Sequence, residues 1–356
     1  MDKKLILAVA GSGKTYHIVQ QLNEQNRFLL ITYTLSGTEN LRNEIINRFG
    51  YLPRNIKIKN YFSFLYTFCY KPFLADEVAD RGISWKYPQS EFNQSYTTVG
   101  GYLYHNRIAK LITLKVINEV RNRLIKYYDY LLIDEIQDFG GNDFNFLTEL
   151  TKANLKMLFV GDFSQHTFDT SRDRNTNSNL HKDINTFVSK FTKLGIHYDP
   201  TSLIKSRRCS KSTCDFIRLK LGINIESYNN LETECRLVTD KSEAERIFKD
   251  NEIVKLFLQK SYDFDCRSDN WGACKGLTYE NVCIVLNDET LKLFNSNDVF
   301  NFKSTVTKNK FYVACSRSKN NLYFVSDKLI KLFRKTTPNK SIAPPKVVSS
   351  QPYLTT

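Results

Sequence analysis

The stretch LAVAGSGKT, residues 7–15, constrains the fold of this chain more than any other stretch. It places a glycine-rich turn between a short apolar strand, predicted over residues 5–9, and a helical pattern that carries Ile18, Val19 and Leu22. This order of strand, loop and helix is the context that a phosphate-binding loop, or P-loop, requires. The sequence therefore predicts an α/β fold that holds a nucleotide at the end of its first strand.

The residues of the loop fit this chemistry. Glycine tolerates the backbone angles with which the amides of Gly11, Ser12 and Gly13 turn toward phosphate oxygens. We expect Lys14 to neutralise the β and γ phosphates and the Thr15 hydroxyl to ligate Mg²⁺. The loop thus predicts a bound nucleoside triphosphate together with Mg²⁺.

Two acidic residues follow a second apolar strand. In LLIDEIQD, residues 131–138, the strand brings Asp134 to the edge of the sheet, where its carboxylate can hold the magnesium ion through water. Glu135 beside it is placed to take the proton from an attacking water. Acids at a strand end are often only a helix cap, but an acid pair that accompanies a P-loop is typical of nucleotide hydrolysis.

Three further side chains narrow the reaction. Gln165 follows the strand LFVGD, and we expect it to orient the attacking water or to sense the γ-phosphate. Arg208 in KSRRCSKS and Arg317 in YVACSRSKN are expected to reach the charge that develops on the phosphate from across a cleft, because guanidinium stays charged and presents a fork of donors. For either arginine taken alone, a surface ion pair is an equally good interpretation.

Apolar strands alternate with helical patterns along the chain, which predicts parallel sheets flanked by helices, with ligands beyond the carboxyl ends of the strands. We expect an N-terminal domain over residues 1–200 with a small insertion at about 71–105, a second domain over 201–334, and a flexible basic tail over 335–356. Single helices are predicted over 107–127 and 242–259.

Composition and charge limit the partners and the compartment. The net charge of +14 and the pI near 9.2 favour a polyanionic partner such as nucleic acid, although excess lysine can also be only a solvated surface. The eight cysteines are scattered without a CxxC pair, which predicts reduced thiols in a cytoplasmic protein. No apolar run approaches the roughly 20 residues of a membrane span, so we expect no membrane partner.

Eight segments, taken in order, resemble the motifs of superfamily-one helicases of the UvrD/Rep/PcrA type: AGSGKT, ITYT, NYFSFL, DEIQD, GDFSQ, RRCS, KGLTYENV and YVACSRSK. The resemblance extends from the P-loop to about Val325, in a compact form that lacks the large inserted subdomains. It implies two RecA-like domains with ATP between them. It also implies ATP-driven movement along single-stranded DNA, in the 3′ to 5′ direction.

Carried over position by position, the resemblance implies three groups of site residues. The catalytic group is Glu135, Gln165, Arg208 and Arg317, and the metal ligands are Thr15 and Asp134. The residues that contact the nucleotide are Ala10, Gly11, Ser12, Gly13, Lys14, Thr15, Arg207 and Gly276. The residues that contact the strand are Thr34, Tyr61, Phe62, Phe168 and Thr278. For Tyr61 and Phe62, a place in the core of an aromatic-rich helix is an equally good interpretation.

The chain departs from the UvrD pattern in three places. Related helicases carry a Gln-containing segment that recognises adenine before the first strand, whereas only residues 1–4 precede it here, so selection for adenine is left open. Arg207 stands where the family has a tyrosine that stacks on the base, and its planar guanidinium can still stack. Thr278 stands where UvrD-type proteins mostly have glutamate, and threonine is commoner in RecD-like and viral helicases.

Two other functions stay open at this point. The first is a helicase-like nucleotide switch that acts with a protein partner such as a nuclease, which the compact architecture and the basic tail suggest. The second is a viral-type RNA helicase, which RRCS and KGLTYENV support and DEIQD opposes.

Overall fold

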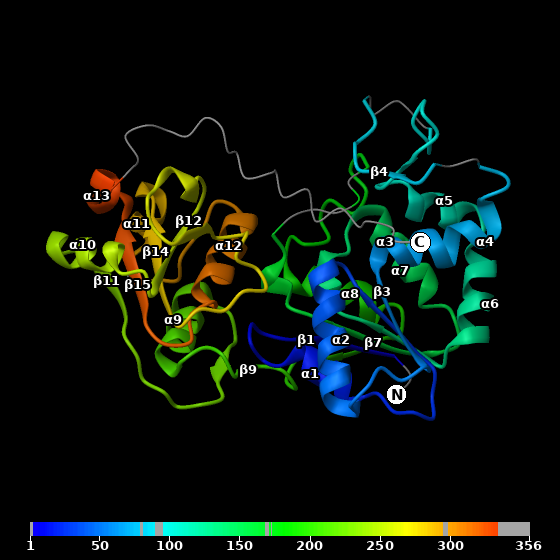
Figure 1. The fold of residues 1–356 in the computed structure, drawn as a ribbon, viewed down its shortest axis with the longest axis horizontal. Helices are drawn as coiled ribbons and strands as arrows, with labels where there is room; N and C mark the ends of the chain where they lie inside the picture. Colours follow the sequence, from blue (N-terminus) through cyan, green and yellow to red (C-terminus); the bar gives the residue numbers. More distant parts are fainter. Residues whose placement is uncertain are drawn as a thin grey trace.

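The computed structural model describes residues 3–78, 81–89, 95–167, 171, 173–294 and 298–333. Two β-sheets lie side by side along its longest axis, each with helices packed against it (Figure 1). The predicted fold class, α/β with parallel sheets flanked by helices, is confirmed. The predicted tail over 335–356 and the strand-contact residue Phe168 lie outside the described residues.

The first sheet has six parallel strands in the order β3-β2-β6-β7-β1-β8. They are β1 (Lys3–Leu7), β2 (Phe28–Thr32), β3 (Ile56–Asn60), β6 (Tyr130–Ile133), β7 (Lys156–Gly161) and β8 (His197–Asp199). All carboxyl ends therefore share one edge. Because β6, β7 and β1 are neighbours and strands lie about 5 Å apart, the residues that follow these three strands meet within roughly 10 Å.

Alternate residues of β1 enter two different hydrophobic cores. Leu5 and Leu7 pack on one face of the sheet and Ile6 and Ala8 on the other. The first face is covered by α3 (Tyr61–Ser63), a π-helix (Phe64–Tyr70), α5 (Ile108–Lys115), α6 (Ile117–Tyr127), α7 (Gly141–Leu150) and α8 (Ile184–Thr192). The second face is covered by α1 (Lys14–Gln20) and α2 (Leu35–Phe49). A sheet that is buried on both faces needs apolar residues along whole strands, as in FLLIT.

The region of the predicted insertion carries a short helix and a small parallel pair of strands. These are α4 (Lys71–Leu74), β4 (Ile83–Ser84) and β5 (Leu103–Tyr104). The single helix predicted over 107–127 is wrong, because Val116 leaves the helical region with φ −140° and divides it into α5 and α6.

The second sheet has five parallel strands in the order β11-β15-β14-β12-β13. They are β11 (Cys235–Val238), β12 (Ile253–Phe257), β13 (Ser268–Asn270), β14 (Asn281–Leu286) and β15 (Leu322–Ser326). Its helices are α9 (Lys211–Leu221), α10 (Lys241–Lys249), α11 (Asp288–Phe294), α12 (Thr305–Cys315) and α13 (Asp327–Ile330). A two-stranded sheet of β9 (Lys205–Ser206) and β10 (Glu226–Ser227) lies where the chain enters this domain.

The helix predicted over 242–259 is also wrong in its second half. The helix α10 ends at Lys249, and the IVKLF segment that follows forms β12, with every residue buried. A short apolar run fits a buried helix and a buried strand equally well. Lys255, a charged residue in the middle of this run, made a fully buried strand harder to predict. In the structure the Lys255 ammonium bonds to the backbone carbonyl of Asp250.

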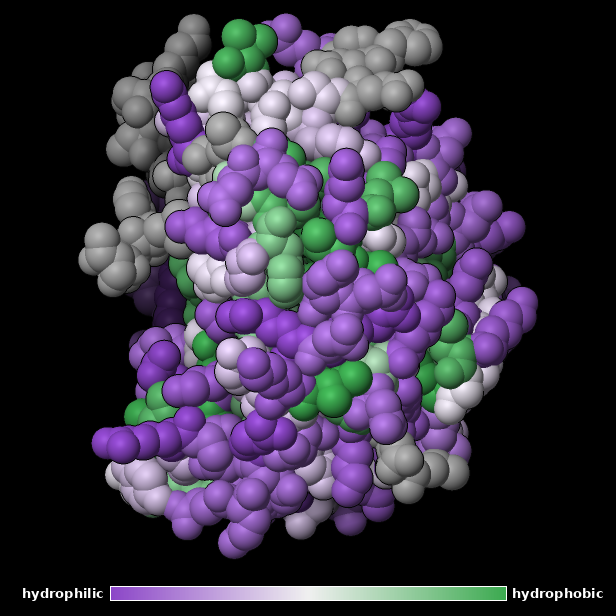
Figure 2. Space-filling model, turned by 90° about the vertical axis from the view of Figure 1, so that its right-hand side faces the viewer, coloured by the Kyte–Doolittle hydropathy of each residue, from purple (hydrophilic) through white to green (hydrophobic). Residues whose placement is uncertain are grey.

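Figure 2 shows the outer end of the first domain, the side that carries α4 and α6. This surface is mostly hydrophilic, and hydrophobic side chains are exposed on it in small separate areas. Across the described part of the chain, no helix combines the length and the apolarity needed to cross a membrane. All eight cysteines are free thiols in the structure.

Two histidines stack where the loop after β7 meets the segment before α8. The ring centroids of His166 and His181 lie 3.5 Å apart with the planes 9° from parallel. Nδ1 of His166 lies 2.9 Å from the carbonyl oxygen of Gln137. Burial, together with the neighbouring His166, lowers the pKa of His181 from 6.5 to about 3.

This pKa shift predicts acid sensitivity. Because the pKa of His181 is lower in the folded chain than in the unfolded chain, the stability it contributes is complete above about pH 6.5 and falls as the pH drops toward 3. The slope is up to about 1.4 kcal/mol per pH unit. His181→Phe keeps a ring in the stack, so its melting temperature should change less between pH 7.5 and pH 5 than that of the wild type. The exposed His197→Phe is the control, and an equal pH dependence in His181→Phe would contradict the prediction.

Candidate active site

The loop between β1 and α1 has the geometry of a phosphate cradle. Gly11 and Gly13 have φ angles of +71° and +88°, in the left-handed region that favours glycine. Gly13 is the N-cap of α1, so the first N–H groups of this helix lack acceptors within the helix and suit an anion. The Ser12 hydroxyl donates to the carbonyl of Val9 at 2.8 Å and closes the loop. Lys14 begins the helix.

Asp134 and Glu135 follow β6 at the same edge of the sheet. Asp134 is buried, and its Oδ1 accepts from the backbone N–H of Glu135 at 2.9 Å. Glu135 has φ +54°, which is rare for a residue with a side chain, and its carboxylate accepts from the amide of Gln137. The strained backbone turns the Glu135 carboxylate away from the line of the strand.

The two carboxyl groups of the acid pair have pKa values shifted in opposite directions. Burial and the neighbouring Glu135 raise the pKa of Asp134. Burial also opposes the charge on Glu135, but Lys14 and Lys275 outweigh it and lower the pKa of that carboxyl. The Thr15 hydroxyl, 3.4 Å from the Asn40 amide, adds a third oxygen donor. Carboxylate and hydroxyl oxygens with water are what Mg²⁺ prefers, so Asp134 and Thr15 fit the predicted ion.

Gln165 is buried, and its side-chain amide is hydrogen-bonded to an acidic residue. Its Nε2 donates to Oδ2 of Asp162 at 2.8 Å, and Asp162 is the residue that follows β7. The backbone N–H of Asp162 in turn donates to Oε1 of Gln137 at 2.9 Å. A side chain at Gly161 would lie 2.2 Å from that same oxygen, so only glycine fits there. The bond to Asp162 uses one N–H of the Gln165 amide, which leaves the other N–H and the amide oxygen for a water or a phosphate.

Arg317 is held entirely by its own domain. Its side chain is 1% exposed, and its three nitrogens donate to the Val313 carbonyl at 2.9 Å, the Leu277 carbonyl at 3.1 Å and the Ser316 hydroxyl at 3.1 Å. Its charge nevertheless acts on Glu135 across the domain boundary. Arg317 thus lies near the site but does not point at the phosphate loop.

Arg208 lies directly against the phosphate loop. A Cβ added at Gly11 would lie 2.6 Å from Cβ of Arg208 and 2.7 Å from Oγ of Ser206. The Arg208 guanidinium donates to the carbonyl of Ser316 at 3.2 Å. Burial and the charge of Arg317 lower the pKa of Arg208 to about 10, so it stays charged at neutral pH. The two predicted arginines are therefore neighbours at the edge of the loop.

Arg207, unlike Arg208, is exposed, and its side chain packs on an aromatic ring. Its backbone N–H donates to the Gly11 carbonyl at 2.8 Å, and its Nε would lie 3.9 Å from a Cβ at Gly13. The exposed guanidinium stacks 4.2 Å above the ring of Tyr228, which is also exposed. Sequence reasoning missed Tyr228, because its place beside the loop depends on the pairing of β10 with β9.

A hydroxyl from the second domain links the loop to Asp162. Tyr312 on α12 is fully buried, donates to Oδ2 of Asp162 at 3.0 Å and accepts from the backbone N–H of Ala10 at 2.9 Å. One turn earlier on the same helix, Asn309 donates to the carbonyl of His166 at 2.7 Å. Tyr312 belongs to YVACSRSK, but only its arginine drew attention in the sequence, because a tyrosine in an apolar helix is typical of a core residue.

A buried ion pair makes a second link between the domains. Nζ of Lys275 lies 2.8 Å from Oδ2 of Asp138, which is 1% exposed. The next residue, Gly276, was predicted to contact the nucleotide, but it lies exposed with φ +89° in the loop before β14. Asp138 is buried and Lys275 is partly exposed, and the pair is a direct contact between the two domains.

The residues predicted to contact a strand lie in different environments. Thr34 is exposed, and its hydroxyl caps α2 by accepting from the Gly37 N–H at 3.0 Å. Thr278 is exposed in the loop before β14. Tyr61 and Phe62 are only 1% and 8% exposed and pack with other aromatic rings. In this conformation neither ring offers a face to a base, which agrees with the core interpretation of these two residues.

Comparisons with known proteins point to one superfamily. A family model described as the viral superfamily 1 RNA helicase core domain matches residues 106–326, and a model described as an AAA domain matches residues 2–169. A search of curated proteins gave no match. A solved complex of arterivirus nonstructural protein 10, a helicase, with DNA is similar at 14% identity and a TM-score of 0.49, over 93% of this chain and 63% of that chain.

The helicase of PRRSV is similar at 12% identity and a TM-score of 0.44, over 94% of this chain and 55% of that chain. The chain thus spans less than two thirds of the length of these viral helicases.

The Tyr312 hydroxyl can be tested by removing it. In Tyr312→Phe the Ala10 N–H loses its acceptor, and Oδ2 of Asp162 keeps only the bond from Gln165. This change should lower the free energy of unfolding by about 1–3 kcal/mol. Amide hydrogen exchange of the loop around residues 8–13 should become faster. Tyr61→Phe removes an equally buried hydroxyl inside the first domain and should leave exchange in the loop unchanged. Wild-type exchange in Tyr312→Phe would show that this hydroxyl does not fix the loop.

Proposed function

The chain belongs to the superfamily 1 helicases, in the family described by the viral RNA helicase core, and we propose that it is an ATP-driven motor that moves along single-stranded nucleic acid. One observation supports this most strongly. The phosphate loop and the acid pair lie at the carboxyl edge of the first sheet, while Arg208 and Arg317 approach the same place from the second domain. A nucleotide bound there contacts both domains, so its hydrolysis can change how they pack.

In the proposed reaction the first domain binds the phosphates and activates the attacking water. The N–H groups of the loop and Lys14 bind the β and γ phosphates, and Thr15 and Asp134 would hold Mg²⁺, which neutralises the charge that develops on the phosphates. Glu135 takes the proton of the attacking water, for which its lowered pKa keeps it ionised at neutral pH. Gln165 orients that water with the part of its amide that does not bind Asp162.

The second domain completes the site. Arg317 donates to the carbonyls of Val313 and Leu277, and in the proposed cycle its guanidinium leaves them to contact the γ-phosphate. Arg208 donates one bond, to the Ser316 carbonyl, so its other N–H groups can contact the phosphate while that bond remains. The exchange at Arg317 links phosphate binding to a rearrangement between the domains. This is the type of cycle that moves a strand by one step per hydrolysis.

We propose DNA as the strand and 3′ to 5′ as the direction, from the resemblance to the UvrD type. RNA is the second candidate, which the match to the model of viral RNA helicases favours. Both strands present phosphates and flat bases and differ in the 2′-hydroxyl and in thymine against uracil, so measured stimulation has to decide between them.

The hydrolysis step has a direct test. Glu135→Gln and Lys14→Ala should each lower ATP turnover stimulated by single strands by at least about a hundredfold, the usual contribution of a general base. Turnover is measured against titrations of single-stranded DNA, RNA and duplex, with the exposed Glu39→Gln on α2 as the matched control. Full turnover in Glu135→Gln would refute the assigned base. Stimulation by none of the polymers would favour a nucleotide switch that acts with a partner such as a nuclease.

We also propose that Arg207, supported by the ring of Tyr228, stacks on the base of the nucleotide. A flat face makes no hydrogen bonds to the edge of the base and therefore does not distinguish one base from another. Arg207→Ala should raise KM for ATP about tenfold with little change in kcat, and Tyr228→Ala should have a smaller effect of the same kind. In the wild type, kcat/KM for ATP and GTP should differ by less than about tenfold.

The exposed Arg246→Ala on α10 is the control for the loss of a positive charge. An unchanged KM in Arg207→Ala would contradict the stacking. A strong preference for ATP would instead indicate that other groups recognise the edge of adenine.

A further inference from the structure

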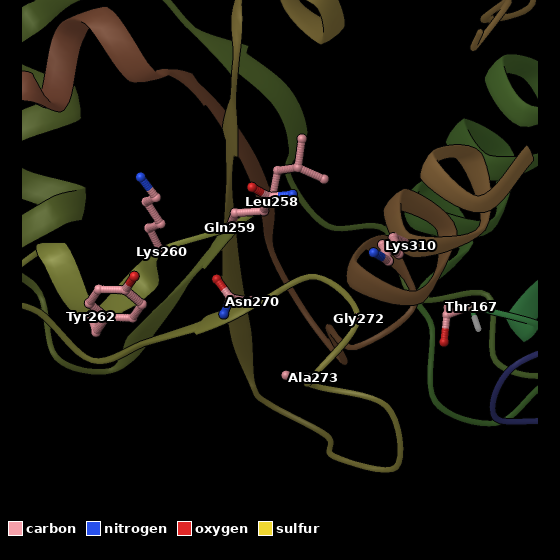
Figure 3. A pocket seen from close by; sticks show the side chains of 9 residues that line it. All are labelled: Thr167, Leu258, Gln259, Lys260, Tyr262, Asn270, Gly272, Ala273 and Lys310. Carbon is pink, nitrogen blue, oxygen red and sulfur yellow. The ribbon is translucent and has the colours of Figure 1, made fainter. Parts of the chain in front are cut away.

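A hollow of about 550 Å³ lies between the two domains, at the carboxyl ends of β12 and β13 (Figure 3). Most of its lining comes from the second domain, including Lys310 of α12 and the loop around Gly272. One wall is Thr167 of the first domain, two residues after Gln165. None of the lining residues belongs to the phosphate loop, so the hollow is a separate place from the nucleotide site.

The hollow is positively charged. Lys260 and Lys310 both line it, and no aspartate or glutamate does. Neither ammonium group has an ion-pair partner within the described ranges of the chain. Figure 3 shows the two side chains on opposite sides of the space, with Asn270 between them. The volume is in the range of sites that hold one nucleotide-sized group.

Each lysine has one distinctive local feature, a close contact for Lys310 and an unusual backbone angle for Lys260. A Cβ at Gly272 would contact Cγ and Cε of Lys310 at 3.5 Å each, so the stem of this lysine runs along the glycine and only its ammonium group is free to reach a ligand. Lys260 has φ +57°, a conformation that is strained for a residue with a side chain. Such strain is common at binding sites. A chance surface lysine needs neither feature.

The hollow also offers an aromatic ring and an amide. The ring of Tyr262 is 47% exposed. Oδ1 of Asn270 accepts from the backbone N–H of Ser261 at 3.1 Å, which orients the amide so that its NH₂ group is left for a ligand. Two cations beside an open aromatic ring match the two chemical parts of a nucleic acid strand, the phosphate and the base.

We propose that this hollow binds one to two nucleotides of a single strand, with Lys260 and Lys310 on successive phosphates and Tyr262 against a base. The proposal rests on the proposed function and identifies strand contacts that the sequence did not predict. In this proposal the nucleic acid strand contacts the exposed ring of Tyr262, whereas the rings of Tyr61 and Phe62, which the sequence predicted as strand contacts, are buried.

The position of the hollow ties strand binding to the nucleotide cycle. Within α12, Asn309 and Tyr312 contact the first domain, and Lys310 between them contacts the hollow. Thr167, which lines the hollow on the side of Lys310, adjoins His166, whose carbonyl accepts the Asn309 bond (Figure 3). A shift of α12 against the first domain therefore moves Lys310 relative to Thr167 and changes the shape of the hollow.

The test measures the affinity of the full chain for labelled oligo-dT and oligo-U by fluorescence anisotropy between 50 and 200 mM salt. Lys260→Gln/Lys310→Gln should bind both about tenfold more weakly at the low-salt end. The slope of log K against log salt should fall by about 1.4, because two phosphates are no longer neutralised by a lysine. The control is Lys241→Gln/Lys249→Gln, two exposed lysines of α10 on the outer side of the second domain (Figure 1).

The ring has its own pair of variants. Tyr262→Ala should weaken binding about tenfold or more without changing the salt slope, because stacking involves no ion release. Tyr262→Phe keeps the ring and should bind as the wild type does.

The possible results separate this inference from the function. If the double variant binds as its control does while single strands still stimulate hydrolysis, the inference is wrong and the function stands. If the wild type neither binds oligonucleotides nor is stimulated by them, both are wrong. If thymidine monophosphate binds with a dependence on both lysines while oligonucleotide affinity is unaffected, the hollow holds a free nucleotide and the inference is again wrong.

Discussion

The hydroxyl of Tyr312 is the contact on which the arrangement of this site depends. It accepts from the backbone of the phosphate loop and donates to Asp162, so a single atom of the second domain touches two parts of the first. Asp162 also holds Gln165, and its backbone holds Gln137, which bonds Glu135. These bonds form one continuous chain from the loop to the acid beside the expected metal.

The sequence predicted what depends on single strands and on the turns that follow them. The P-loop, the acids after β6 and Gln165 after β7 were found because a strand end and a short pattern suffice to define them, and their places in the sheet agree with that interpretation. The helicase superfamily was also predicted correctly. The predicted subtype was UvrD, but the family model that matches describes viral RNA helicases.

What the sequence missed depends on contacts between distant segments. Lys275 and Asp138 are 137 positions apart, and no local pattern indicates that they pair. Tyr228 lies beside the loop only because β10 pairs with β9. The β12 segment fits a helix equally well in the sequence, because a run in which every residue is buried shows no alternation of polar and apolar residues. Tyr61 and Phe62 show the reverse difficulty, because an aromatic run fits a strand-binding surface and a core equally well.

The left-handed backbone conformation of Glu135 lowers the stability of the fold, whereas its carboxylate belongs to the proposed active site. A glycine at this position would relax the turn and relieve of order 1–3 kcal/mol of strain, yet it would leave the acid pair without its second member. Selection for a more stable protein and selection for an active one therefore favour different residues at the same position. In the mechanism proposed above, a variant with glycine at position 135 would therefore be more stable and would bind nucleotide without hydrolysing it.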